Sequence, residues 1–230
     1  MDPHAQPVRL SSAVKPLAAA LAQSTKEPKP LSTRTDEPSA DDAAWRKMGI
    51  PRRFWHASLN DFPRAMSDEV EAHLAGDGFF LCGGVGTGKS HLAAAILKAW
   101  HSQGRTAPRE RRTYANHDQR GGVFISVVEY LSRVQESFTP EPPSTEWVVR
   151  SYQRAGALVL DDLGAEKVTE WSFSALYRVL DYRVGEMLPM VVTSNMSLGD
   201  LIEWHPRIAS RLGGLCALKM TGRDKRRDRP

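Results

Sequence analysis

The sequence predicts an α/β protein in which helices cover both faces of a parallel sheet. Two observations predict this fold: short apolar runs alternate with helix-like segments, and a glycine-rich loop joins the first such run to the next helix. The run at 157–160 is almost wholly apolar, which is typical of a parallel strand buried on both faces. Since such sheets bind ligands at the carboxyl ends of their strands, we expect a site at that edge.

The elements of this fold follow from local patterns. Strands are predicted at 79–83, 123–127, 157–160, 190–193 and 217–220. Helices are predicted at 68–75, 91–100, 128–138, 145–155 and 169–184, and one or two short helices at 198–212. The proline-rich segment 139–143 cannot continue a helix.

Composition divides the 230 residues into three parts. Residues 1–44 are rich in Pro, Ala, Ser and Thr and are predicted to be a disordered arm. Residues 45–222 are the predicted globular domain, in which the polar and basic stretch 104–122 is a predicted loop. Residues 223–230 form a basic tail that either contacts a phosphate backbone or only adds solubility.

The overall composition limits the class of protein. The net charge is +4, and the stretch from Lys219 to Pro230, with six basic and two acidic residues, accounts for all of it. No apolar run reaches membrane-spanning length and no secretion signal is evident, so we expect a cytoplasmic protein without a membrane partner. Cys82 and Cys216 lie in apolar runs and are expected to pack there as small apolar side chains.

Residues 83–90 match the phosphate-binding pattern G-x-x-x-x-G-K-[ST]. Glycines at 84, 86 and 88 let the loop backbone turn its N–H groups toward a triphosphate. Lys89 is expected to reach the β- and γ-phosphates and Ser90 to bind Mg²⁺, while the next helix directs its positive end at the anion. The predicted nucleotide-binding residues are Gly83, Gly84, Val85, Gly86, Thr87, Gly88, Lys89, Ser90 and His91.

The apolar run 158–160 leads into two carboxylates, Asp161 and Asp162, which is the form of a Walker B element. Asp161 is expected to hold Mg²⁺ through the water shell of the ion, because Mg²⁺ takes few protein carboxylates directly. Asp162 is expected to orient and polarise an attacking water. The alternative is an acidic cap for the turn after the strand.

Two later segments carry further candidate groups. Asn195 follows the strand at 190–193 and could hold the lytic water against the γ-phosphate, although such a residue is also common in turns and helix caps. Arg207 and Arg211 lie four residues apart, on one face of a helix. A guanidinium there can stabilise the γ-phosphate of a neighbouring subunit, or it can form a surface salt bridge.

The order and spacing of these four motifs resemble those of the DnaC/IstB-type AAA+ ATPases, which are helicase loaders and transposition helper ATPases. Residues 49–59 resemble the lead-in of helicase loaders in particular, and Arg183 and residues 220–224 also fit the family pattern. The resemblance covers about residues 49–226. It implies a P-loop NTPase of AAA+ type at 45–222, with strand order 5-1-4-3-2 and self-assembly into a ring or spiral homo-oligomer with ATP.

The resemblance also implies roles for single residues. Lys89 and Ser90 serve ATP and Mg²⁺, Asp161 and Asp162 serve metal and hydrolysis, Asn195 is sensor 1, and Arg211 is the arginine finger, supported by Arg207. The helices after the second strand belong to the DNA-facing surface of the family, which makes Arg133, Arg150 and Arg154 candidates for DNA contact.

The expected function is ATP hydrolysis coupled to loading of a replicative helicase onto single-stranded DNA. A transposition helper that binds DNA and a transposase would share every catalytic residue, and the N-terminal arm shows no folded helicase-binding domain, so the partner stays open. A small-molecule kinase and a DNA-binding adaptor that does not hydrolyse nucleotide are the alternatives from other classes.

Overall fold

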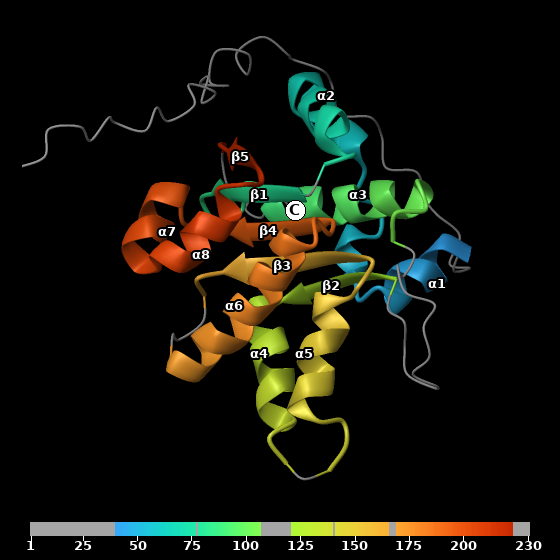
Figure 1. The fold of residues 1–230 in the computed structure, drawn as a ribbon. Helices are drawn as coiled ribbons and strands as arrows, with labels where there is room; N and C mark the ends of the chain where they lie inside the picture. Colours follow the sequence, from blue (N-terminus) through green and yellow to red (C-terminus); the bar gives the residue numbers. More distant parts are fainter. Residues whose placement is uncertain (1–39, 77, 107–120, 140, 166–168, 223–230) are drawn as a thin grey trace, which may run out of the picture. The chain divides into compact units, whose positions relative to one another are not determined.

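The computed structural model describes residues 40–76, 78–106, 121–139, 141–165 and 169–222 (Figure 1). Nearly all of the predicted disordered arm, most of the basic stretch 104–122 and the basic tail 223–230 lie outside the described residues. Within those residues, no helix combines the length and apolar character needed to cross a membrane.

The core of the fold is a sheet of five parallel strands in the order β2-β3-β4-β1-β5. Read from the other edge, this is the order 5-1-4-3-2, so the fold class implied by the family resemblance is confirmed. The strands are β1 (Gly78–Gly83), β2 (Gly122–Ser126), β3 (Ala157–Leu163), β4 (Met190–Ser194) and β5 (Cys216–Met220).

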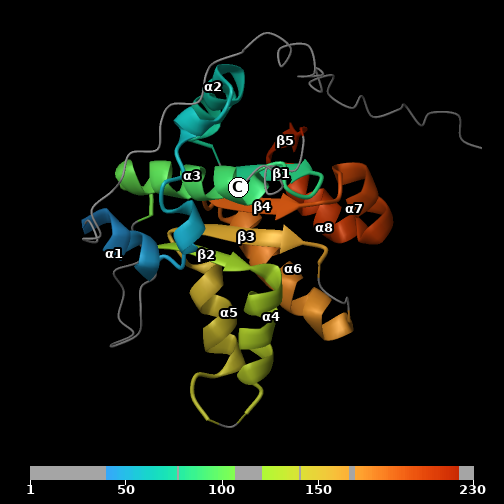
Figure 2. The ribbon, with the colours of Figure 1, turned by 180° about the vertical axis from the view of Figure 1, so that it is seen from behind.

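Helices cover both faces of the sheet (Figures 1 and 2). Alternate residues of β1 show the two layers: Phe79 and Leu81 belong to one buried cluster, and Phe80 and Cys82 to the other. The first face carries α1 (Ala40–Lys47), α2 (Arg64–His73) and α3 (Lys89–Ser102). The second face carries α4 (Val127–Glu136), α5 (Thr145–Gln153), α6 (Glu170–Gly185), α7 (Leu198–Trp204) and α8 (Pro206–Leu212).

Several element bounds differ from the sequence prediction. Strand β3 continues three residues past 160 with a register shift, so it includes both acidic residues. Helix α2 begins at Arg64 rather than at 68, directly after Pro63, a residue that favours helix starts. Helix α1 begins at Ala40, inside the segment predicted as a disordered arm, and buries Trp45 against the first face.

The lead-in, which comprises residues 48–63 between α1 and α2, is bonded to α3. It contains two short 3₁₀ turns, η2 (Arg52–Phe54) and η3 (Leu59–Asp61), which the sequence did not predict. The ammonium of Lys98 on α3 donates to the carbonyl oxygens of Trp55 (2.7 Å) and Ala57 (2.8 Å). These charge-assisted hydrogen bonds hold the lead-in along the helix that follows the phosphate-binding loop.

Arg183 on α6 has a structural role in the second face. Its guanidinium is fully buried and donates to the carbonyl oxygens of Tyr152 (3.0 Å), Gln153 (3.0 Å), Ala155 (2.8 Å) and Pro189 (2.6 Å). These carbonyls lie at the end of α5, just before β3 and just before β4. Arg183 therefore joins three chain segments.

We expect Arg183→Leu to lower the free energy of unfolding by about 3 kcal/mol or more, because it leaves four carbonyls without their buried charged donor. Urea denaturation followed by circular dichroism measures the change. The control is Arg64→Leu, which removes an exposed arginine and should change stability by no more than about 0.5 kcal/mol. Equal effects of the two substitutions would contradict the structural role of Arg183.

Candidate functional site

The carboxyl ends of β1, β3 and β4 bring the predicted motifs to one edge of the sheet. The strands are neighbours, and Ser194 at the end of β4 pairs with Cys82 of β1 on one side and with Leu163 of β3 on the other. The phosphate-binding loop follows β1, the acidic pair ends β3, and Asn195 follows β4. Three motifs that are up to about a hundred residues apart in sequence thus share one site, as expected for a parallel sheet.

The loop conformation requires glycine at both of its ends. Gly88 has φ of 96° as the N-cap of α3, a left-handed conformation that other residues rarely adopt. Gly83 has φ of 151°, and a Cβ there would lie 2.1 Å from the carbonyl oxygen of Met220. Gly84 has no positive φ, so the freedom predicted for Gly84 is needed at Gly83 instead. The loop thus approaches β5 closely and presents the N-terminus of α3.

Lys89 lies at the centre of the site. The residue is 7% exposed, and its ammonium donates to the carbonyl oxygens of Gly83 and Gly84, both at 2.8 Å. It also donates to Oδ1 of Asn195 at 2.7 Å. The charge of Lys89 is therefore held within the loop, next to the side chain predicted as sensor 1.

Asp161 is buried at the end of β3 and is surrounded by hydroxyl groups. Thr193 donates to its Oδ1 at 2.7 Å, and the hydroxyl of Ser90 is close enough to lower the pKa of its carboxyl. Burial raises the pKa of Asp161 above its usual value, while the hydrogen bonds from Thr193 and Ser90 act in the opposite direction. A cation beside this carboxylate would favour its charged form, so Ser90 and Asp161 have the chemistry that the predicted Mg²⁺ site needs.

Asp162 faces the other way from its neighbour and is exposed. Its φ is 66°, a left-handed conformation that Asp tolerates better than most residues, and its backbone N–H donates to Thr193 Oγ1 at 2.9 Å. The amide of Asn195 donates to Asp162 Oδ1 at 3.3 Å. Asn195 thus contacts both Lys89 and Asp162, and Thr193 holds both members of the acidic pair.

The side chain of His91 contacts the lead-in rather than the loop. Its Nε2 lies 2.7 Å from Asp61 Oδ2, and its ring makes edge contacts with Phe54 and Phe62 at centroid distances of 6.0 and 5.6 Å. This cluster ties the first turn of α3 to the lead-in. Its contribution to nucleotide binding stays a prediction.

Arg211 on α8 is held by α6. Its Nε donates to Asp181 Oδ1 at 2.7 Å, and its Nη2 donates to the hydroxyl of Tyr177 at 3.1 Å. Arg207, one turn earlier on the same helix, is exposed. Within the described residues, the polar and ring contacts of Arg211 are all with α6 and none is with the loop of its own chain, which leaves it free for a role at another subunit.

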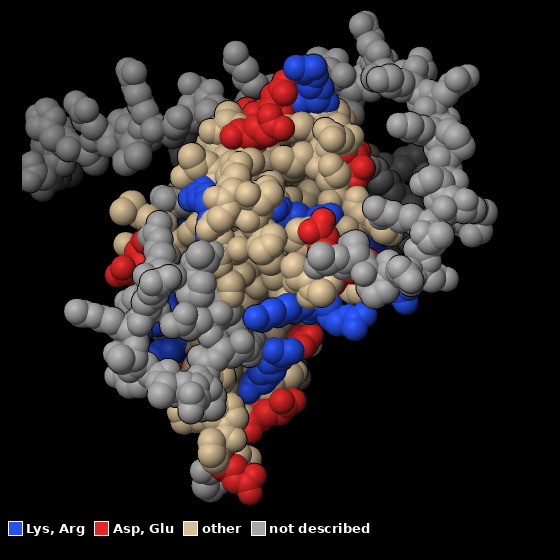
Figure 3. Space-filling model, turned by 90° about the vertical axis from the view of Figure 1, so that its right-hand side faces the viewer, with Lys and Arg blue, Asp and Glu red and all other residues tan. Residues whose placement is uncertain are grey.

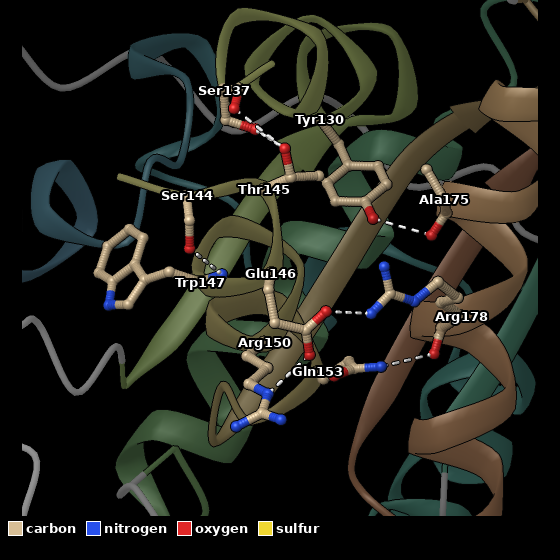
Figure 4. Close-up of polar contacts among 10 residues, drawn as sticks. All are labelled: Tyr130, Ser137, Ser144, Thr145, Glu146, Trp147, Arg150, Gln153, Ala175 and Arg178. Atoms are coloured by element: carbon tan, nitrogen blue, oxygen red, sulfur yellow. Dashed lines mark hydrogen bonds and ion pairs between the residues drawn. The ribbon is translucent and has the colours of Figure 1, made fainter. Parts of the chain in front are cut away.

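Arg133 and Arg150, which are candidates for DNA contact, form ion pairs with carboxylates of their own helices. Arg133 donates to Glu129 at 2.6 Å and to the hydroxyl of Tyr152 at 3.1 Å. Arg150 donates to Glu146 at 2.8 Å, and Glu146 also accepts a hydrogen bond from Arg178 on α6 (Figure 4). Basic and acidic side chains are also interleaved on the face shown in Figure 3. Phosphates would therefore compete with carboxylates for these arginines, and DNA contact here stays a prediction.

The sequence places Thr193 among the polar groups that end the strand at 190–193, beside the expected nucleotide, but gives it no role. Its contacts with both acidic residues appear only in the structure, and sequence reasoning did not identify Tyr177 or Asp181 as part of the site. Tyr177 and Asp181 lie four residues apart on one helix, but nothing local links them to Arg211, about thirty residues later.

Comparison with known proteins gives the chain sequence relatives among helicase loaders. No family model matches it. It is 24% identical over 156 residues to the replicative helicase loader DnaC of Escherichia coli, covering 65% of this chain and 57% of DnaC. It is 28% identical over 127 residues to the replicative helicase loader DnaI of Bacillus subtilis, covering 55% of this chain and 35% of DnaI. The resemblance to the DnaC-like AAA+ family is confirmed.

Solved structures of other proteins have the same fold as this chain. A crystal structure of the DnaC helicase loader aligns with a TM-score of 0.55 at 23% identity and covers 74% of this chain and 100% of that one. A crystal structure of DnaI aligns with a TM-score of 0.59 at 22% identity, over 78% and 99% of the two chains. AMPPCP-bound DnaA of Aquifex aeolicus aligns with a TM-score of 0.59 at 17% identity, over 77% and 53%. The sequence match spans little more than half of DnaC, so the activity and partners of the whole loaders are not assigned to this chain by similarity alone.

Proposed function

We propose that this chain is an ATP-hydrolysing AAA+ protein that loads a replicative helicase onto single-stranded DNA. The observation that carries the proposal is the continuous set of contacts from Lys89 through Asn195 to Asp162. It links the group expected to bind phosphate with the group expected to activate water. Similarity to DnaC and DnaI supports the loader role.

Lys89, Ser90 and Asp161 would bind the nucleotide and its metal. Lys89 would exchange its neutral carbonyl partners for phosphate oxygens, because a charged donor binds an anion more strongly than a carbonyl. Ser90 and Asp161 would hold Mg²⁺, which neutralises charge on the phosphates when bound. The N-terminus of α3 would add its backbone N–H groups and dipole.

Asp162 and Asn195 would handle the attacking water. Asp162 is exposed at the edge of the sheet, where its carboxylate can accept a proton from water, and Asn195 fixes that carboxylate with its amide. Because Asn195 also contacts Lys89, a change at the phosphate-binding end of the site would be passed to the water-binding end. Asn195 would in this way act as a sensor that couples the state of the bound nucleotide to β4, the strand that it follows.

The partners we propose are a replicative helicase, single-stranded DNA and further copies of this chain in the ATP state. The similarity to helicase loaders favours a helicase over a transposase. Capture of partners from the native host with a tagged form of this chain separates the two: recovery of a helicase supports the proposal, and recovery of a transposase overturns it.

The direct test of the catalytic assignment is Asp162→Asn. We expect the variant to bind ATP with unchanged affinity but to hydrolyse it about 100-fold more slowly, because the amide fills the same space and cannot take a proton. Equilibrium titration with a fluorescent ATP analogue and phosphate release measure the two quantities. Glu203→Gln, which neutralises an exposed carboxylate on α7, is the control and should leave both unchanged. Undiminished hydrolysis by Asp162→Asn would rule out its assigned role.

A further inference from the structure

Helix α6 presents three side chains at four-residue spacing to α8 and the residue before it. Phe173 stacks on His205, which precedes α8, with ring centroids 3.7 Å apart and planes inclined by 9°. Tyr177 and Asp181 then both contact Arg211. Since residues four apart lie on the same side of a helix, these contacts form one continuous seam between α6 and α8.

The contacts of Arg211 use only one side of its guanidinium. Nε donates to Asp181 Oδ1 at 2.7 Å and Nη2 to the Tyr177 hydroxyl at 3.1 Å, and these two nitrogens form the lateral edge of the group. Within the described part of the chain, Nη1 has no hydrogen-bond partner, and the side chain is 40% exposed. The terminal edge is therefore available to an anion outside this chain.

We propose that Tyr177 and Asp181 are positioning residues that hold Arg211 by its lateral edge and leave its terminal edge free for the γ-phosphate of ATP bound to a neighbouring copy. This inference rests on the proposed function, in which Arg211 is the arginine finger. An arginine held at one edge retains a rigid pair of N–H donors at the other, which suits bidentate binding of phosphate. The seam also removes rotamer freedom that a free arginine would lose on reaching the phosphate.

The geometry favours positioning over sequestration of Arg211. A carboxylate that sequesters an arginine pairs with it through two parallel hydrogen bonds, whereas here Asp181 supplies one oxygen and Tyr177 a neutral hydroxyl. Both sides of the ion pair are accessible, with side-chain exposures of 40% and 47%. Helix α6 is held in place on its side of the seam, because Arg183, two residues after Asp181, donates hydrogen bonds to four carbonyl groups in the buried layer.

The experiment compares Asp181→Asn, Tyr177→Phe and the double variant with the native chain. We expect each single substitution to lower kcat for ATP hydrolysis about 10-fold and the double variant further, with the KM for ATP and the affinity of the isolated chain for a fluorescent ATP analogue unchanged. A purely structural role would instead lower the midpoint of thermal unfolding. The control is Asp68→Asn, which removes a carboxylate from another exposed ion pair and should leave kcat unchanged.

Arg211→Ala, measured alongside, distinguishes a failure of the positioning role from a failure of the proposed function. If Arg211→Ala loses turnover while Asp181→Asn and Tyr177→Phe keep it, the positioning role is wrong and the proposed function stands. If Arg211→Ala itself keeps full turnover, the finger assignment in the proposed function is wrong. A rise in kcat for Asp181→Asn would mean that the contact sequesters Arg211, and would overturn the positioning role.

Discussion

Lys89→Ala is expected to weaken nucleotide binding strongly and, with it, to impair every ATP-dependent activity of the chain. The ammonium of Lys89 is the one charged donor that the described part of the phosphate-binding loop supplies, and three acceptors already converge on it. Loss of charged hydrogen bonds to phosphate should weaken ATP binding by about 100-fold or more. Titration with a fluorescent ATP analogue measures the affinity, and phosphate release measures hydrolysis.

The control for this substitution is Lys47→Ala, which removes an exposed lysine at the end of α1 and should leave ATP binding unchanged. Thermal unfolding of both variants checks that the loop and α3 remain folded. Native ATP affinity in Lys89→Ala would contradict the site. If ATP binding is lost while DNA binding and partner loading are untouched, nucleotide has only a structural role and the chain acts as an adaptor.

The positions of the candidate motifs could be predicted because each is a local pattern. The loop at 83–90 and the acidic pair after 158–160 are recognisable without knowledge of the fold, and the carboxyl edge of a parallel sheet brings such segments together. The order of the strands in the sheet, by contrast, could not be predicted from local patterns. Hydrophobic periodicity shows that a strand is buried but not which strand lies beside it, so the order came from the family resemblance.

The parts that sequence did not predict depend on contacts between distant residues. The requirement for glycine at Gly83 comes from the close approach of Met220 on β5, which the loop sequence does not reveal. The left-handed conformation of Asp162 depends on the register shift of β3 and on Thr193 of β4. Local propensity describes neither, because both arise when strands far apart in sequence are paired.

Arg211→Ala is expected to lower ATP hydrolysis by the assembled protein about 1,000-fold, because an arginine finger stabilises charge that develops only in the transition state. The isolated chain should bind ATP normally, since Arg211 contacts α6 and no residue of its own loop. Arg207→Ala is the matched comparison: it removes an exposed arginine one turn away, and as a supporting residue it should have a smaller effect. Weaker ATP binding by the isolated Arg211 variant would instead place this residue in the site of its own chain.

Mixing two inactive variants provides the decisive measurement of whether Arg211 acts between subunits. Arg211→Ala retains an intact site without a finger to donate, and Lys89→Ala retains an intact finger without a site. In an equal mixture, roughly a quarter of the head-to-tail interfaces would combine a native site with a native finger, so a corresponding part of the native activity should return. If Arg211 acted within its own chain, no combination of the two variants would contain a complete site and the mixture would stay inactive. Recovery of activity therefore requires a site shared between neighbouring copies.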